Sequence, residues 1–567
     1  MAAPSRKPPG PFSKLLSAAN DEWRATPFYR LTLGGADPDR IAQWGKDPRA
    51  GDPRRGEEIL RGRWRIGAER LSANYRIPWS APPPSLHFAA RLHSFCWLGD
   101  VAAVGGAAGA AIADYVATWN EGFGEWHAEA WAPELTAERL FAWLCHGRAA
   151  FEGGDPTLRP ALMRSFGRQA RHLAVAATDL SYPPARIKAG AALTLCGCTG
   201  IPDGDRLLDA GVELLEEACA QQFLSDGGHL SRAPEILAEA LCDLIAADSA
   251  LVRHAIESPK LLRDAMPKMA AMLRFLSLGD GALACFNGGG ECNAATVNRA
   301  VAEFEGEMRR FTVAPQSGYH RLGARDLALV MDCAAAPPSL YGDRAHAGCL
   351  SFELSSGLDR MIVNVGSQLE LDPQWRAAGR ATNGHSTLVV DDALSAEFER
   401  VGRGAARPRG PGQVSAKRAD DDEGARIEAS HDGYRADYGL IHRRTIYVDK
   451  SGADLRGVDS LARPMAEKKS AAPQRPPFAI RFHLHPEVNA RLGEAGAALI
   501  ECPGTGGAWR LKTDAARMHF EDSVYLGAPD GPQRTRQIVL SGAADPNGTG
   551  DGPPNRVRWA FTRVDRA

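Results

Sequence analysis

The stretch Leu350-Ser351-Phe352-Glu353-Leu354-Ser355 alternates apolar and polar side chains with a period of two. This period predicts a β-strand that turns one face toward a core. The same alternation returns around Ile446 and Val448 and around Phe482 and Leu484, and Gly, Asp and Pro turns separate these segments. From about residue 311 onward, the sequence therefore predicts a large antiparallel β-sandwich.

Upstream of this point the apolar residues follow a different period. They recur every three or four residues in a stripe, as in Leu262, Met266, Met269, Leu273 and Leu276. This spacing is typical of amphipathic helices, and short Gly- and Pro-rich turns separate several such segments. The first half of the chain is therefore predicted to be an array of antiparallel helical hairpins.

The two periods together predict an α+β multidomain protein, because helices and strands occupy separate blocks of sequence rather than alternating. We expect an N-terminal extension over residues 1–49, a helical domain over 50–310 and a β-sandwich domain over 311–567. The polar segment 402–426, rich in Gly and Arg, is predicted to be an exposed loop or hairpin tip.

Composition narrows the functional classes. The 567 residues carry a net charge of -2, which argues against a nucleic-acid-binding protein. The 11 cysteines include no Cys-x-x-Cys pair and indicate no disulfide framework. Neither a signal peptide nor an apolar run long enough to insert into a membrane is expected. The default location is the cytoplasm, with the periplasm left open, and the sequence does not set the oligomeric state.

Three motifs occur in order along the chain: Asp226-Gly227-Gly228-His229, Ser317-Gly318-Tyr319, and a series from Arg344 to Leu388. The last begins Arg344-Ala345-His346-Ala347-Gly348 and ends Arg380-Ala381-Thr382-Asn383-Gly384-His385-Ser386-Thr387-Leu388. This series resembles the heparinase II/III-like family of polysaccharide lyases. The resemblance implies an (α/α) toroid followed by a β-sandwich, with a substrate cleft between the two domains.

The resemblance also implies an activity, the cleavage of uronic-acid-containing glycans such as glycosaminoglycans by β-elimination. That reaction needs a donor that neutralises the uronate carboxylate, a base that removes the adjacent proton and an acid that protonates the leaving oxygen. The expected partner is an anionic polysaccharide or oligosaccharide, and no organic cofactor is required. The implied catalytic residues are His229, Tyr319 and His346, and the implied substrate-binding residues are Arg232, Asn287, Arg344 and Arg380.

The same resemblance implies a structural zinc ion held by His346, His385 and the residue at the acid position, which here is Asn364. An asparagine is a much weaker zinc ligand than a carboxylate. The alternative is a pair of polar histidines that hydrogen-bond to each other or to the backbone. His483 and His485, two residues apart, are expected to face solvent from a strand.

Several positions depart from the family pattern. The place of the catalytic Asn reads Pro183-Pro184-Ala185-Arg186, and the place of a catalytic Tyr reads Ala233-Pro234-Glu235-Ile236. Arg344 and Gly348 stand where the family has a histidine and an aspartate. A non-catalytic glycan-binding or scaffold protein of the same fold is therefore the alternative function. A glycoside hydrolase, which would need two opposed carboxylates among Asp226, Glu235, Asp280 and Glu353, is a third hypothesis.

Overall fold

The computed structural model describes residues 22–24, 26–67, 69–73, 77–106, 108–367, 373–400, 406–464, 475–493, 496–505 and 507–564. The chain divides into two compact units. The first contains residues 1–223 and 239–266, and the second contains residues 224–238 and 267–567.

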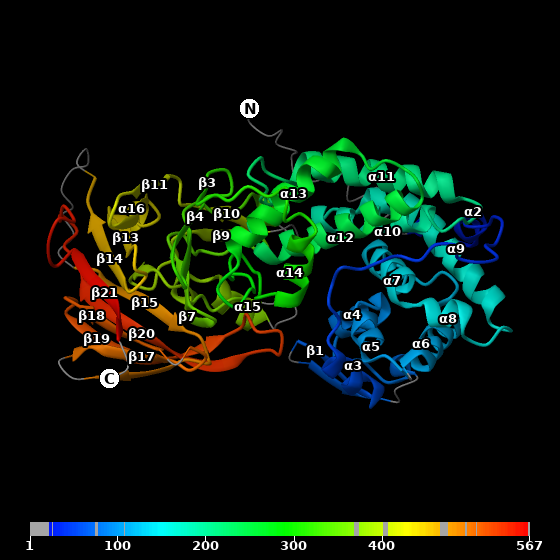
Figure 1. Ribbon diagram of the computed structural model, residues 1–567, viewed down its shortest axis with the longest axis horizontal. Helices are drawn as coiled ribbons and strands as arrows, with labels where there is room; N and C mark the ends of the chain where they lie inside the picture. Colours follow the sequence, from blue (N-terminus) through cyan, green and yellow to red (C-terminus); the bar gives the residue numbers. More distant parts are fainter. Residues whose placement is uncertain are drawn as a thin grey trace. The chain divides into compact units, whose positions relative to one another are not determined.

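The first unit is helical, apart from a two-stranded hairpin (Figure 1). Its hairpin pairs β1 (Arg63–Ile66) with β2 (Glu69–Ser72) in antiparallel register. Two further helices carry the chain from one unit to the other, because α12 (Pro234–Arg253) and α13 (Lys260–Leu276) each contribute residues to both. The helices wholly within this unit are α2 (Pro27–Thr32), α3 (Pro53–Leu60), α4 (Leu86–Ser94), α5 (Leu98–Val104), α6 (Ala108–Phe123), α7 (Pro133–His146), α8 (Arg148–Glu152), α9 (Arg159–Ala176), α10 (Pro183–Gly197) and α11 (Gly204–Gln222).

Local sequence explains where these helices begin. Pro53, Pro133 and Pro183 stand at the first positions of α3, α7 and α10, where a missing amide N–H costs nothing. The Ser85 side chain caps α4 by accepting a hydrogen bond from the amide of Phe88. The predicted stripe from Leu262 to Leu276 on α13 is buried at all five positions, which confirms the helical interpretation of that segment.

The second unit is built on two large antiparallel sheets (Figure 1). In the described residues, one sheet has the strand order β11-β12-β13-β14-β21-β18-β17-β16 and the other β19-β20-β15-β7-β6-β5-β4-β3, with β8 added beside β15. The strands of the first are β11 (Val414–Asp420), β12 (Gly424–His431), β13 (Ile441–Asp449), β14 (Asp454–Ala462), β16 (Asn489–Leu492), β17 (Ala498–Cys502), β18 (Gly507–Thr513) and β21 (Arg556–Val564). Those of the second are β3 (Val313–Ala314), β4 (Tyr319–Ala324), β5 (Leu327–Asp332), β6 (Phe352–Ser356), β7 (Asp359–Val363), β8 (Leu388–Val390), β15 (Pro477–Leu484), β19 (Arg517–Tyr525) and β20 (Gln533–Ala543).

Smaller elements complete this unit. They are α14 (Ala294–Ala302), α15 (Pro373–Arg380), α16 (Arg435–Tyr438) and a hairpin of β9 (Glu397–Arg400) with β10 (Ala406–Arg409). The two large sheets share one apolar core, in which Phe352 and Phe482 of one sheet meet Trp559 of the other. Helices followed by packed antiparallel sheets confirm the predicted fold class.

Two details of the strand predictions can now be stated. The segment 402–426 is not an exposed loop over its described part, because β10, β11 and the start of β12 lie within it, and the antiparallel pairing of β11 with β12 agrees with the alternative of a long hairpin tip. The side chains of β11 alternate between exposed and half-buried positions, so its sequence is polar although its backbone pairs with β12. Strand β6 is buried on both faces, including Glu353 and Ser355, whereas its alternation predicted one buried face.

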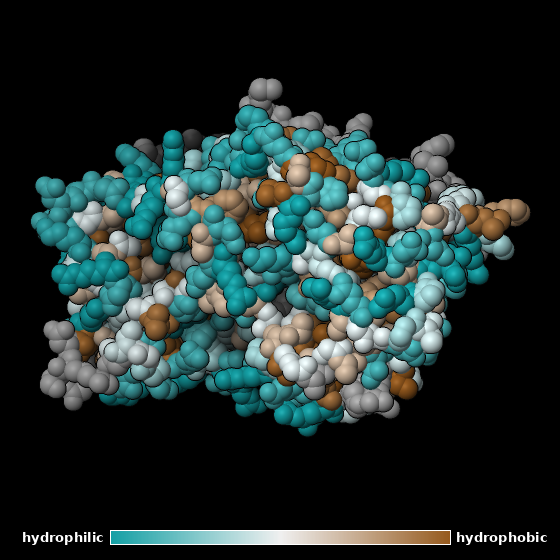
Figure 2. Space-filling model, turned by 45° about the vertical axis from the view of Figure 1, so that its right-hand side comes forward, coloured by the Kyte–Doolittle hydropathy of each residue, from teal (hydrophilic) through white to brown (hydrophobic). Residues whose placement is uncertain are grey.

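Within the described residues, no helix has both the length and the apolar composition that crossing a bilayer requires. The face drawn in Figure 2 is mostly hydrophilic, with hydrophobic side chains in small separate groups.

Candidate functional site

The segment 224–238 belongs to the second compact unit, together with all of the β-strands from β3 onward. As a result, every candidate catalytic, binding and metal-binding residue predicted from the sequence lies in that one unit. They are His229, Arg232, Asn287, Tyr319, Arg344, His346, Asn364, Arg380 and His385.

The Asp-Gly-Gly-His motif fastens this segment to the turn that precedes β4. The Asp226 carboxylate accepts hydrogen bonds from the amides of Gln316 and Ser317, at 2.9 and 2.7 Å, and from the Ser317 hydroxyl at 2.7 Å. A Cβ on Gly227 would lie 2.1 Å from the Lys268 carbonyl oxygen, and one on Gly228 would lie 1.9 Å from the Ser317 hydroxyl. Only glycines fit these two positions, so the motif is explained by packing.

His229 lies beneath the surface rather than in an open cleft. Its side chain is buried, and its Nδ1 accepts hydrogen bonds from the Ser231 hydroxyl at 2.7 Å and from the Ser231 amide at 3.0 Å. The ring also meets Tyr341 edge to face, with centroids 5.3 Å apart. Burial, assisted by the positive charge of Arg344, lowers the pKa of His229 to about 3, so the imidazole is neutral near pH 7.

Arg232 has a buried carboxylate partner of its own. Its guanidinium forms an ion pair with Asp332 and donates to the carbonyl oxygens of Ser317, at 2.8 Å, and Ala335, at 2.6 Å. The same group lies 5.0 Å from the centre of the Tyr319 ring. An arginine that a buried carboxylate already neutralises offers little to an external anion.

Tyr319 is bound to the main chain of the same arginine. Its hydroxyl donates to the carbonyl oxygen of Arg232 at 2.5 Å and accepts from Nδ2 of Asn287 at 3.3 Å. Burial raises the pKa of the phenol, so it does not ionise near neutral pH. Asn287, with a left-handed φ of 47°, uses its Oδ1 to accept from the amide of His346 at 3.4 Å. The structure therefore brings Arg232, Tyr319, Asn287 and His346 into one hydrogen-bonded chain.

His346 and His385 contact each other directly, with Nδ1 of His346 3.2 Å from Nε2 of His385. Nδ1 of His385 faces the carbonyl oxygen of Ala381 at 2.8 Å and must carry a hydrogen there, because a carbonyl only accepts. Nε2 of His385 then accepts from Nδ1–H of His346. Burial lowers the pKa of both rings, to about 4 for His385, so the pair is neutral near pH 7.

Within the described residues, this histidine pair lacks a third ligand of the kind that a structural zinc ion requires. Each of the two facing nitrogens is used in the hydrogen bond between the rings. In the side chain of Asn364, Nδ2 donates to the Cys285 carbonyl at 3.2 Å and Oδ1 accepts from the Ser386 backbone amide at 3.0 Å. Both polar atoms of this side chain therefore bind the backbone. In the parts of the chain that the structure describes, no group of three or more His, Cys, Asp or Glu side chains could hold a metal ion.

The remaining two arginines differ in how firmly they are held. Arg380 donates to the carbonyl oxygens of Ala345, at 3.1 Å, and Gly342, at 2.8 Å, and its guanidinium lies 4.1 Å from the centre of the Phe398 ring. Arg344 makes only long contacts, at 3.4 Å to both Glu235 and the Gly288 carbonyl, and its Nε is buried without a hydrogen-bond partner. Arg344 is therefore the better candidate for binding an anion.

The carboxylates that a hydrolase would need are also engaged. Asp226 binds the turn at residues 316–317, Glu235 contacts Arg344, and Asp280 pairs with Arg360 at 2.8 Å. Glu353 is fully buried, with its Oε2 3.7 Å from Nη1 of Arg360. These contacts do not place any two of the four carboxylates opposite each other, as a glycoside hydrolase would require.

Sequence reasoning missed a polar cluster around Glu291. Its carboxylate accepts a hydrogen bond from the Tyr525 hydroxyl at 2.5 Å and lies 3.2 Å from Nε2 of His485. The expectation that His483 and His485 face solvent is wrong, because both are buried. His483 contacts the Ser523 hydroxyl and the Asn383 carbonyl, both at 2.9 Å. The distance in sequence between these partners left no local pattern that could have revealed them.

Comparisons with known proteins agree with this architecture. Residues 307–560 match the family model "Heparinase II/III-like, C-terminal". Over 562 residues, the chain is 33% identical to FtsZ-localized protein C of Caulobacter vibrioides, covering 96% of this chain and 94% of that protein.

Solved structures show the same fold at low identity. Heparinase III superposes with a TM-score of 0.68 at 13% identity, covering 98% of this chain and 92% of that one. A mutant heparan sulfate lyase from Pedobacter heparinus gives a TM-score of 0.58 at 14% identity, covering 98% and 90%. The expected combination of toroid and β-sandwich is thus the fold of heparinase III. The chain belongs to the heparinase II/III-like family of polysaccharide-lyase type, as a divergent member.

Proposed function

We propose that this protein is a non-catalytic member of its family, which acts as a scaffold at assemblies that contain FtsZ. The observation that carries the non-catalytic part of the proposal is the closed network of Tyr319, Arg232 and Asp332. A lyase base must be able to accept a proton from the sugar, whereas the Tyr319 hydroxyl donates to the Arg232 carbonyl and burial raises its pKa. Arg232, which should neutralise a uronate, is neutralised by Asp332.

The two departures from the family pattern support the same proposal. The segment that replaces the catalytic Asn begins α10, and its Arg186 pairs with Glu217 at 2.5 Å. The segment that replaces the catalytic Tyr begins α12, where Ala233 and Ile236 are buried apolar side chains. Neither segment supplies the Asn or the Tyr that the family pattern has at these places.

The relative that shares 33% identity along almost the whole chain is named for its localisation with FtsZ, and not for an activity on glycans. Function follows the site rather than the fold, and the lyase-like structures share only 13% and 14% identity with this chain. If the scaffold also binds an anionic glycan, Arg344 is the residue that we expect to contact it, because its Nη1 is held only by contacts of 3.4 Å within the described residues.

Two assays on the purified full-length chain test the proposal. The first incubates it with a panel of uronate polymers and follows the ultraviolet absorbance of the unsaturated product, with heparinase III as the positive control. We expect no rise in absorbance. A rise that is abolished in Tyr319→Phe would restore the lyase hypothesis.

The second assay is co-sedimentation with FtsZ from the same organism, with and without GTP. We expect the protein to pellet with FtsZ polymers assembled in GTP and to stay in the supernatant without nucleotide. Absence from the pellet under both conditions would contradict the scaffold role, even if the first assay detects no lyase activity.

A further inference from the structure

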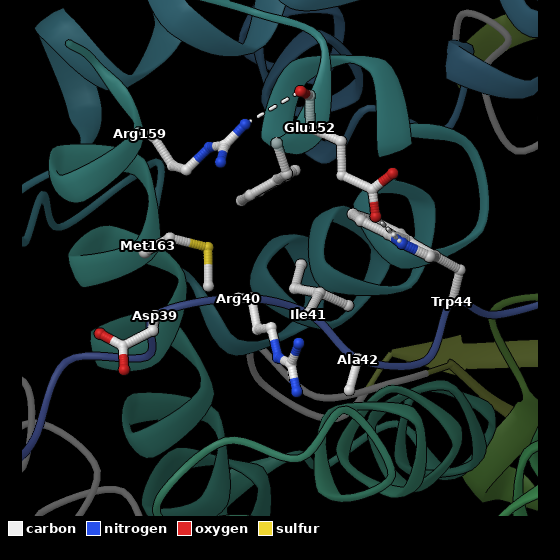
Figure 3. A pocket seen from close by; sticks show the side chains of 9 residues that line it. Asp39, Arg40, Ile41, Ala42, Trp44, Glu152, Arg159 and Met163 are labelled. Atoms are coloured by element: carbon white, nitrogen blue, oxygen red, sulfur yellow. Dashed lines mark hydrogen bonds between the residues drawn. The ribbon is translucent and has the colours of Figure 1, made fainter. Parts of the chain in front are cut away.

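The first compact unit contains a pocket of about 300 Å³ that is separate from the residues discussed above (Figure 3). It lies between the segment 39–44, the end of α8 and the first turns of α9. Its volume is at the lower end of the range for small-molecule sites, roughly 300–1,000 Å³. A pocket of this size accommodates one aromatic or branched aliphatic group.

The floor of the pocket is apolar. Ile41, Phe151 and Met163 line it, and each of these side chains is buried. The half-buried indole of Trp44 closes one side, with its ring centre 5.9 Å from that of Phe151 (Figure 3). An aromatic or aliphatic group placed here would exchange water for contacts with two aromatic rings and a thioether.

Two acids line the pocket, Asp39 and Glu152, and the second already has partners. The Glu152 carboxylate accepts from the Trp44 indole N–H at 2.8 Å and from Nε of Arg148 at 2.6 Å. These bonds hold the indole in place and lower the pKa of Glu152, so the carboxylate is charged but paired. Glu152 therefore forms part of the pocket wall, and its charge does not require a cationic group on the ligand.

Two arginines provide positive charge at the rim. Arg159 starts α9 and lies across the pocket from Trp44, where its Nη2 donates to the main-chain carbonyl of Glu152 at 2.9 Å (Figure 3). A guanidinium has five N–H donors, so most of those of Arg159 have no partner among the described residues. Arg40 is exposed and stands beside Ile41 with its guanidinium turned outward (Figure 3). Helix α9 has no side-chain cap, and its N-terminus adds positive potential to that of the arginine.

From this arrangement we infer that the pocket binds an amphipathic carboxylate. The apolar group enters between Trp44, Phe151 and Met163, and the carboxylate binds Arg159 at the rim, with Arg40 turning in as a second donor. Arginine suits this role because its planar group binds a carboxylate through two parallel hydrogen bonds. The ligand is either a free aryl- or alkyl-carboxylic acid or an acidic residue next to an apolar one in a peptide.

The test is calorimetric titration of the full-length protein with N-acetylphenylalanine and with its uncharged amide. We expect the acid to bind at least about tenfold more tightly than the amide, because a charge-assisted pair to Arg159 is lost in the amide. A third titrant, a peptide with blocked ends and an internal phenylalanine followed by aspartate, distinguishes the two sources. Binding of the peptide at the affinity of the free acid assigns the pocket to a peptide segment, and weaker binding assigns it to a free acid.

Three variants locate the site. Arg159→Gln should remove the preference for the acid over the amide, and Ala42→Trp should block both ligands by filling the pocket from an exposed position. The matched control is Arg164→Gln, on the same helix, where the arginine pairs with Asp37 instead of facing this pocket. It should bind like the wild type, and circular dichroism checks that all three variants fold.

Equal affinities for acid and amide in the wild type would overturn the inference. So would the absence of binding, or binding of the acid that neither Arg159→Gln nor Ala42→Trp weakens.

Discussion

The hydroxyl of Tyr319 donates a hydrogen bond of 2.5 Å to the main-chain carbonyl of Arg232, a residue 87 positions earlier in the chain. This bond joins the segment 224–238 to the first residue of β4. It also commits a phenol that could have been a lyase base to a structural role. The consequences can be measured as stability, independently of any activity.

Replacing Tyr319 with Phe should lower the free energy of unfolding by about 1 kcal/mol, the usual net value of one buried hydrogen bond. The Arg232 carbonyl keeps a weaker donor, Nδ2 of Asn287 at 3.3 Å, which limits the loss. Urea denaturation measures the change, and Tyr447→Phe, on a half-buried strand position, is the control that should leave stability unaltered. A loss of several kcal/mol would show that this hydrogen bond contributes more to stability than about 1 kcal/mol.

Removing the guanidinium of Arg232 should be far more damaging. In Arg232→Met the Asp332 carboxylate is left buried without its cation, and we expect a loss of about 3–5 kcal/mol. Hydrogen exchange of the β4 and β5 amides would detect the change, and Arg232→Met combined with Asp332→Leu should recover part of it. The control Arg61→Met breaks an exposed pair with Glu58 and should cost less than about 1 kcal/mol. Similar losses of stability in Arg232→Met and Arg61→Met would contradict the conclusion that Arg232 compensates a buried charge.

Glu353 should make the stability of the protein depend on pH. Burial, opposed by Arg360, raises its pKa from 4.5 to about 7. The folded state therefore holds this proton more tightly than the unfolded state, so stability is fully present below pH 4.5 and declines as the pH rises through 7. The whole decline is on the order of 3 kcal/mol.

Thermal denaturation between pH 5 and pH 8 measures this slope, and Glu353→Gln should flatten it. Glu291→Gln is a suitable comparison, because the pKa of Glu291 is lowered to about 2 and its contribution is lost only under acidic conditions. An unchanged slope in Glu353→Gln would show that another group titrates in this range.

The pair of His346 and His385 should be independent of zinc. Their facing nitrogens bond to each other, and Asn364 is occupied by backbone groups, so a chelator should leave the melting temperature unchanged. Elemental analysis of the dialysed protein should find no stoichiometric zinc. Stoichiometric metal that is lost in His385→Ala, but retained in a His519→Ala control, would contradict this.

The sequence by itself determined the order and type of the structural blocks. Helical periodicity, as in the stripe from Leu262 to Leu276, and two-residue alternation, as around Phe352, are local consequences of burying one face of an element. The motif series from Asp226 to His385 indicated the family, which the comparisons confirmed. These signals are readable because each depends on neighbours a few residues apart.

Only the tertiary structure decided what the candidate residues do. Arg232 is paired with Asp332, 100 residues away, and Glu353 is buried opposite Arg360 on the face that alternation had assigned to solvent. The sequence shows the same charged residue whether its side chain faces a substrate or a buried counter-charge. Which of the two it meets depends on how distant strands and loops pack, because a charge taken out of water must find its partner within the fold.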